Sequence, residues 1–186
     1  MVGSIDKYKN YKILYEKYLD QMYSYGMAFG VEENTLYDLI HDVFLHLFEH
    51  QNEMGEGKYE KYYLFRCLKN RILYHKKQEV NIETLEDINN IPFVIVTSGL
   101  DIIEEKEERI EITRQINDMM KCLTDRQREA LYLRFMQELE YDEIAVILGL
   151  TLKGTRKLIY RAIERIREQY GITVVYLLLN TYFFPF

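Results

Sequence analysis

Two histidines and a glutamate lie where they could carry out metal chemistry, in the stretch HLFEH at residues 46–50. On a helix, His46, Glu49 and His50 would share one face, as the His-x-x-Glu-His pattern of zinc proteases requires. The chain is small for such an enzyme, and no downstream glutamate on a recognisable helix offers a third ligand. A zinc peptidase is therefore kept only as an alternative. We expect a solvated polar face with no metal, no cofactor and no catalytic residue.

A second candidate site is the segment from Lys58 to Lys77, which carries seven Lys or Arg residues against one acid. Aromatic rings can stack on unpaired bases while cations hold the phosphates, so this composition suits a single nucleic-acid strand. An extruded base needs a pocket, which the loop GEGKYEK could form. The residues expected at this site are Lys58, Tyr59, Lys61, Tyr62, Arg66, Lys69, Arg71 and Tyr74. The alternative is that the aromatic side chains are core, as we expect for Tyr63, Phe65 and Leu68.

A helix-turn-helix is predicted by the order of YDEIAVIL, GLT and LKGTRKLIYRAIERI. Gly149 can adopt the left-handed conformation that ends the first helix, and Thr151 can cap the second. Basic residues in the first turns of the second helix suit base edges and phosphates in a major groove. The residues expected to contact duplex DNA are Arg126, Arg128, Lys153, Thr155, Arg156, Lys157, Tyr160 and Arg161. The alternative is a solvated basic face on an ordinary helical hairpin.

Helices must position these side chains, because apolar residues recur at helical spacing and only two prolines interrupt the chain. We expect helices over about 8–30, 33–51 and 58–78, and again from about residue 100. Thr124 is expected to cap a helix, with Gln127 as its capping-box partner. Short runs such as FVIV and ITVVYLLL are ambiguous. The fold class predicted is all-α.

Charge divides the chain into two parts. Between residues 79 and 111, ten acids stand against two bases, a net charge of -8, and the first part has no helical period. We expect two small helical domains at 1–78 and 100–170, joined by an acidic linker at 79–99. The tail 171–186 has no charged residue. It is expected to pack on the body, the alternatives being a regulatory partner or a membrane surface.

Composition excludes several classes of protein. The chain has 186 residues, 48% hydrophobic and 29% charged, so a packed core is expected and global disorder is not. Cys67 and Cys122 form neither a disulfide framework nor a paired metal motif, which suits a reducing cytosol. The N-terminus has no secretory signal pattern, so we expect a cytoplasmic protein.

The second half resembles a known family. The stretch LTDRQREALYLRFMQELEYDEIAVILGLTLKGTRKLIYRAIERIRE is similar to the C-terminal domain of bacterial RNA polymerase sigma factors of the extracytoplasmic function (ECF) type. The matching residues are Gln127, Arg128, Tyr141, Glu143, Ile144, Ala145, Leu148, Gly149, Arg161 and Ala162. In the first half, YDLIHDVFLHLFEH resembles the polymerase-docking helix of the family. The stretch YYLFRCLKNRIL resembles its strand-melting segment, and Asn70 falls on the asparagine of that segment, which adds Asn70 to the expected single-strand site. Two domains in order make the resemblance specific over about residues 8–168.

The resemblance implies a function. Such a chain would bind core RNA polymerase and direct promoter-specific initiation, with an anti-sigma factor as a regulatory partner and no small-molecule substrate. Its docking residues would be Leu39, Asp42, Val43 and Leu47. The melting segment would open the downstream promoter element, and the helix-turn-helix would read the upstream element as duplex. Departures occur at Glu140, where a serine would cap the helix, and at 154–156, which implies a different promoter sequence.

One alternative keeps the same helix-turn-helix in a different class of protein. A self-sufficient dimeric transcription regulator would bind a palindrome without polymerase. The basic, aromatic segment would then have no role.

Overall fold

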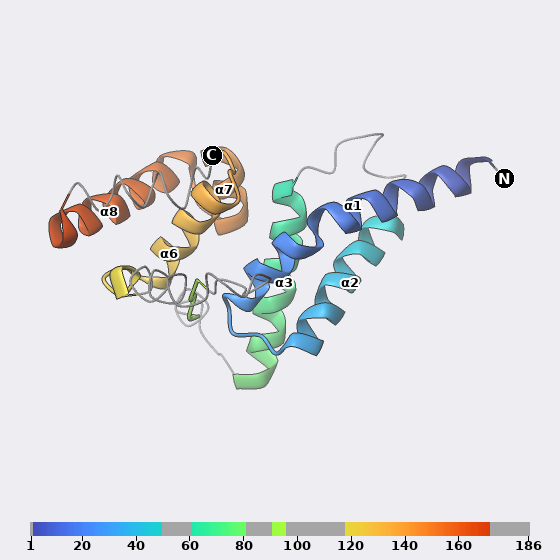
Figure 1. Cartoon of the computed structure of the whole chain (residues 1–186), viewed down its shortest axis with the longest axis horizontal. Coiled ribbons are helices and arrows are strands. Elements are labelled where there is room, and N and C mark those ends of the chain that lie inside the picture. The colour runs from blue at the N-terminus through green and yellow to red at the C-terminus, as the bar shows by residue number, and fades with distance from the viewer. Residues whose placement is uncertain (1, 50–60, 81–90, 96–117, 172–186) are drawn as a thin grey trace, which may run out of the picture. The chain divides into compact units, whose positions relative to one another are not determined.

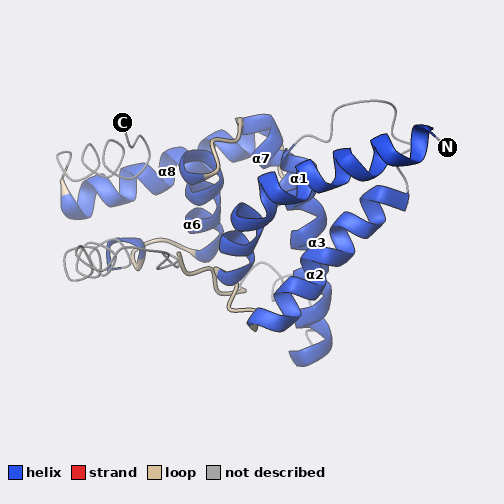
Figure 2. Ribbon diagram, turned by 45° about the vertical axis from the view of Figure 1, so that its right-hand side comes forward, coloured by secondary structure: helices blue, strands red, loops and turns tan. Residues whose placement is uncertain are grey.

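The computed structural model describes residues 2–49, 61–80, 91–95 and 118–171, and the elements within them are helices (Figure 1). No strand occurs in these ranges (Figure 2), which confirms the predicted all-α fold. The elements are α1 (Val2–Met27), α2 (Glu33–Glu49), α3 (Lys61–Val80), α6 (Asp125–Leu131), the π-helix η1 (Tyr132–Met136), α7 (Tyr141–Leu148) and α8 (Leu152–Tyr170). The chain divides into two compact units, Met1–Thr84 and Leu85–Phe186. No helix of the described ranges is long and apolar enough to cross a membrane.

The first unit packs α1, α2 and α3 against one another. Helix α2 buries one apolar stripe at helical spacing, made of Leu36, Ile40, Val43, Phe44 and Leu47. Helix α3 meets it with four side chains that are fully buried, Leu64, Phe65, Leu68 and Ile72. The prediction that Phe65 and Leu68 are core is confirmed, whereas Tyr63 is half-buried.

Helices α1 and α2 approach closely because α1 carries Gly26 at the crossing. A Cβ atom at Gly26 would lie 2.2 Å from Leu36 Cδ1, so only glycine fits without moving the leucine. Aromatic rings also pack between the helices of this unit. The Tyr25 and Phe65 ring centroids are 5.0 Å apart, as are those of Tyr15 and Phe44. Such aromatic contacts add specific geometry to apolar burial.

The second unit is defined by well-capped helix ends. The Thr124 side chain accepts from the backbone N–H of Gln127, and the Gln127 side chain accepts from the backbone N–H of Thr124, as predicted. Gly149 ends α7 with a φ of 62°, and the Thr151 hydroxyl accepts from Gly154 N at 3.0 Å. These caps fix the turn between α7 and α8 as the sequence predicts. Ile144, Ala145, Ile159 and Ala162 then close the core between the two helices.

Residues 91–95 pack into the second unit without forming a helix or a strand. Ile91, Phe93 and Ile95 are buried, whereas Val94 is 51% exposed. The Phe93 ring contacts Tyr132 edge-on at 5.5 Å. The sequence predicts that this stretch lies within a linker at 79–99. The structure extends α3 to Val80 and gives residues 91–95 a buried, hydrogen-bonded place in the second unit.

Several expectations fall outside the described residues. They concern the loop GEGKYEK with Lys58 and Tyr59, the return of helix near residue 100, and the apolar tail.

Candidate nucleic-acid interface

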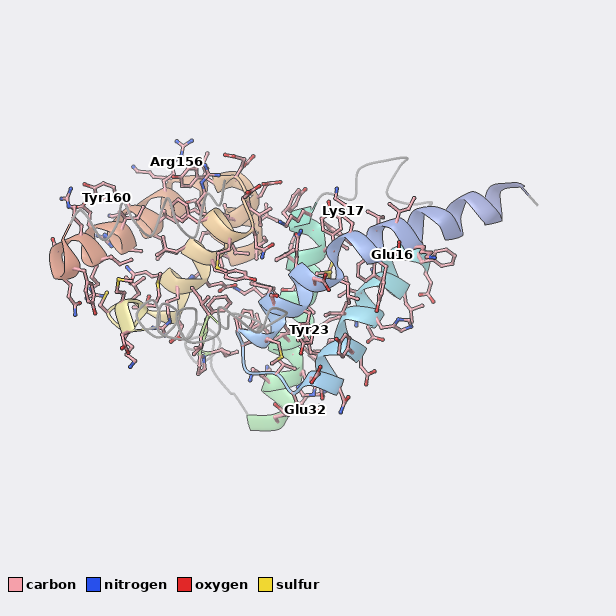
Figure 3. The ribbon with its side chains drawn as sticks, in the orientation of Figure 1. Glu16, Lys17, Tyr23, Glu32, Arg156 and Tyr160 are labelled. Atoms are coloured by element: carbon pink, nitrogen blue, oxygen red, sulfur yellow. The ribbon has the colours of Figure 1, made fainter. Side chains whose placement is uncertain are left out.

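Helix α8 presents one continuous exposed face that is basic and aromatic. Its members recur at helical spacing, and we call them the recognition face: Lys153, Arg156, Lys157, Tyr160 and Arg161. Tyr160 is 64% exposed, and Figure 3 shows Arg156 and Tyr160 projecting from α8 away from α6. The face begins in the first turn of the second helix of a helix-turn-helix, the part that enters a major groove in such motifs. The arrangement can therefore bind duplex DNA by base edges and phosphates.

Thr155 lies on the opposite side of α8. Its side chain is 0% exposed, and its hydroxyl donates to Thr151 O at 3.2 Å. Thr155 shares its buried stripe with Ile159, Ala162 and Ile166. The structure therefore places this predicted contact residue in the core, where its methyl and hydroxyl groups stabilise the turn instead of facing a ligand.

Two arginines expected at the interface are used inside the unit. Arg126 Nη2 donates to Leu148 O at 2.8 Å, so it holds the end of α7. Arg128 donates from Nε to Phe93 O at 2.8 Å, and from Nη1 to Met120 O at 3.0 Å and to Leu123 O at 2.8 Å. Its Nη2 also pairs with the Asp125 carboxylate. These bonds assign Arg128 a structural role, because its donors are directed to backbone carbonyls of its own unit.

Helix α3 carries a second exposed basic face, which we call the α3 outer face: Arg66, Asn70, Tyr74 and Lys77. Tyr74 is 66% exposed and is free to stack on a base. Tyr62 and Lys69 are half-buried at the side of this face, and the Lys61 ammonium lies 5.6 Å from the buried Phe65 ring. The structure therefore brings most of the predicted single-strand residues onto one helix.

Arg71 and Asp42 lie in contact across α3 and α2. Arg71 Nη1 donates to Asp42 Oδ2 at 3.1 Å, and Nη2 donates to the backbone oxygen of the same residue at 3.2 Å. The side chains are 33% and 56% exposed, so the pair lies at the surface, where ion pairs contribute little stability. The sequence predicts polymerase docking for Asp42 and strand binding for Arg71, and it does not predict the contact between them.

The outward side of α2 differs from the one expected. Val43 and Leu47 are each 2% exposed, and Leu39 is half-buried. Five of the exposed residues recur at helical spacing along one side of the helix, which we call the α2 outer face: Asp38, His41, Asp42, Leu45 and Glu49. Leu45 is 41% exposed, which leaves an apolar side chain among acids. Asp38 and Leu45 are exposed on this side and are not among the residues that the sequence predicts for docking, although the phase of the buried stripe places both outside it.

No group of three or more His, Cys, Asp or Glu side chains within the described ranges could hold a metal ion. His46 and Glu49 lie on α2, and His50 lies outside those ranges. Both cysteines are free thiols. Burial raises the pKa of Cys67 and of Cys122, so neither site favours the thiolate that metal binding needs.

Part of the chain matches a known protein family, and two known proteins are similar to it. Residues 113–166 match the family model described as Sigma-70, region 4. The chain is 22% identical over 159 residues to the ECF RNA polymerase sigma factor SigM of Bacillus subtilis (strain 168), across 85% of this chain and 93% of that protein. It is 32% identical over 72 residues to the ferric citrate uptake sigma factor FecI of Escherichia coli (strain K12), across 37% and 42% of the two chains.

A solved structure shares the fold. It is the sigma factor RpoE in complex with the anti-sigma factor NepR from Bartonella quintana, with a TM-score of 0.58 and 19% identity. The likeness covers 88% of this chain and 98% of that one, so it spans both helical units.

Proposed function

We infer that the chain is a sigma factor of the ECF type, which binds core RNA polymerase and directs promoter-specific transcription initiation. The observation that carries this function is the recognition face on a capped helix-turn-helix, within the residues that match region 4. A similar sigma factor over 85% of the chain supports the same function for the rest.

The two units take different roles in this proposal. The first, about residues 1–78, docks on polymerase through the α2 outer face and opens the downstream promoter element on the α3 outer face. The second, about 100–170 with the packed segment 91–95, reads the upstream element as duplex through the recognition face. The acidic stretch between them suits a basic channel of polymerase. An anti-sigma factor is a further partner, since a similar fold was solved with one.

Chemistry on nucleotides stays with polymerase in this proposal. The chain itself is not an enzyme, takes no small-molecule substrate and acts in the cytoplasm with polymerase.

Reconstituted transcription tests the function. Purified full-length chain is added to core polymerase on a library of genomic fragments, and the transcripts are sequenced. We expect initiation at a set of fragments sharing two spaced elements, and none with core polymerase alone. A chain that binds a palindrome as a dimer and leaves polymerase silent would instead be a self-sufficient regulator.

The docking role has a separate test, at Asp42. Reversal of its charge by Asp42→Lys removes an acid from the α2 outer face and should weaken binding in a pull-down with core polymerase. The same change breaks the ion pair with Arg71, so Arg71→Gln serves as the matched control. It removes the pair but leaves α2 unaltered. Equal losses in both variants would assign the effect to the ion pair and would count against docking at Asp42.

A further inference from the structure

Arg134 is held in place at the turn before α7. It belongs to the π-helix η1, a rare geometry often found near functional sites. Its Nη1 donates to Leu139 O at 2.8 Å and to Glu140 Oε1 at 3.0 Å, and its side chain is 26% exposed. Glu138 in the same turn has a φ of 55°, in the left-handed region that few residues other than glycine adopt. These contacts fix the guanidinium relative to the start of α7.

The Tyr141 ring lies next to that guanidinium and next to a second one. The Arg134 guanidinium carbon is 4.9 Å from the ring centroid, and that of Arg156 is 5.8 Å from it. Both distances fall within the range of cation–π attraction. Arg134 precedes α7, Tyr141 begins α7, and Arg156 lies on α8. The ring therefore connects the anchored turn to one arginine of the recognition face.

An exposed arginine has many rotamers, yet reading guanine with two hydrogen bonds requires one placement of its planar fork. A ring that attracts the guanidinium in the free protein already restricts its rotamers. Less conformational entropy is then lost when the arginine bonds guanine, which favours guanine over bases that would require a different rotamer. The region-4 match and the exposed face do not by themselves indicate which arginine is held in this way. The contact with Tyr141 singles out Arg156.

We propose that Tyr141 is a positioning residue that orients Arg156 to read one base pair of the upstream promoter element. Arg134 and Glu140 hold the turn that presents the ring. The proposal rests on the proposed function, because it requires that the recognition face reads duplex DNA. It assigns Tyr141 no contact with the bases, in contrast to Arg156.

The test uses the full-length chain with core polymerase on promoters whose upstream element is randomised, at two salt concentrations. Tyr141→Met removes the ring and keeps an apolar side chain. We expect it to reduce discrimination at the position read by Arg156 about two- to five-fold, the range of an exposed cation–π contact. The salt slope should stay unchanged. Tyr141→Phe keeps the ring and should match the unmodified chain. In an Arg156→Ala background, Tyr141→Met should have no further effect at that position.

The outcomes distinguish a failure of the positioning role from a failure of the proposed sigma-factor function. Loss of discrimination in Arg156→Ala together with none in Tyr141→Met would overturn the positioning role and leave the function intact. No change of discrimination in Arg156→Ala would remove base reading by Arg156 and the positioning role with it. A uniform loss of affinity in Tyr141→Phe at every sequence, with an unchanged salt slope, would make the uncharged tyrosine hydroxyl a contact to the DNA backbone and overturn the proposal.

A spectroscopic measurement covers the case in which Tyr141→Met does not fold. The order parameter of the Arg156 Nε–H bond is measured by NMR in the free, unmodified chain, with Arg161 on the same face as the reference. An order parameter above that of Arg161 supports the proposal. An equal value would overturn it, because the ring would then not restrain the guanidinium.

Discussion

Arginine side chains of the second unit divide into two groups by where their donors are directed. Arg128 donates to three backbone carbonyls and to Asp125 and is 16% exposed, whereas Arg156 and Arg161 face outward. The sequence assigned all three to DNA. A donor that already serves buried carbonyls cannot leave them without exposing unpaired acceptors, so Arg128 holds the unit together while the other two are available to a ligand.

Loss of Arg128 should therefore affect stability more than DNA binding. Arg128→Met keeps much of the aliphatic stem but leaves the carbonyls of Phe93, Met120 and Leu123 without this donor. We expect it to lower the free energy of unfolding by about 2–4 kcal/mol, measured by urea denaturation of the full chain. The exposed Arg161→Met is the control and should change stability by less than about 0.5 kcal/mol. Unchanged stability with a reduced promoter salt slope would restore Arg128 to the DNA interface.

Helix boundaries that depend on local chemistry could be predicted from the sequence. The Thr124 and Gln127 capping box, the left-handed Gly149 and the Thr151 cap each involve residues within three positions of one another. Glu140 occupies the position of a capping serine in the family pattern, and the helix start there is also stabilised by a residue close in sequence. The Glu143 carboxylate accepts from the Glu140 backbone N–H at 2.7 Å, so α7 begins there without a serine.

Features that depend on contacts distant in sequence could not be predicted. Residues 91–95 read as linker because their partners, Asp125 and Arg128, lie about thirty positions further on. The pairing of Asp42 with Arg71 is equally remote in sequence. The burial of Thr155 is a different case, because its spacing from Ile159, Ala162 and Ile166 already marks the core side of α8. The polar hydroxyl of Thr155 concealed that pattern.

The segment 91–95 should contribute strongly to the stability of the second unit. Phe93 is 1% exposed, and its backbone N–H donates to Asp125 Oδ1 at 2.8 Å. Phe93→Ala should cost about 3–4 kcal/mol, since it removes a buried ring and leaves a cavity beside Tyr132. Val94→Ala alters the same segment at an exposed position and should have little effect. Thermal melts of the two variants would be compared. Equal melting temperatures would show that the segment is bound too weakly to matter.

At the scale of the whole molecule, the proposed function gives each of the two units a different form of DNA to bind. The α3 outer face suits an unpaired strand, and the recognition face suits duplex. Changes in the first unit should thus alter strand opening, while changes in the second should alter promoter choice.

Asn70 offers a direct check of this division. It is exposed on α3 between Arg66 and Tyr74. We expect Asn70→Ala to reduce open-complex formation much more than closed-complex binding, because only the open complex presents an unpaired base. Permanganate footprints would report opening, and gel shifts at low temperature would report closed complexes. Footprints identical to those of the unmodified chain would remove Asn70 from the site.

The packing of residues 91–95 also limits the length of chain that connects α3 to the second unit. Only residues 81–90 separate the end of α3 at Val80 from Ile91, and a chain of that length spans at most roughly 40 Å whatever conformation it adopts. Each base pair added between two promoter elements moves them about 3.4 Å apart along the duplex. The tether therefore limits the spacers that one chain can bridge.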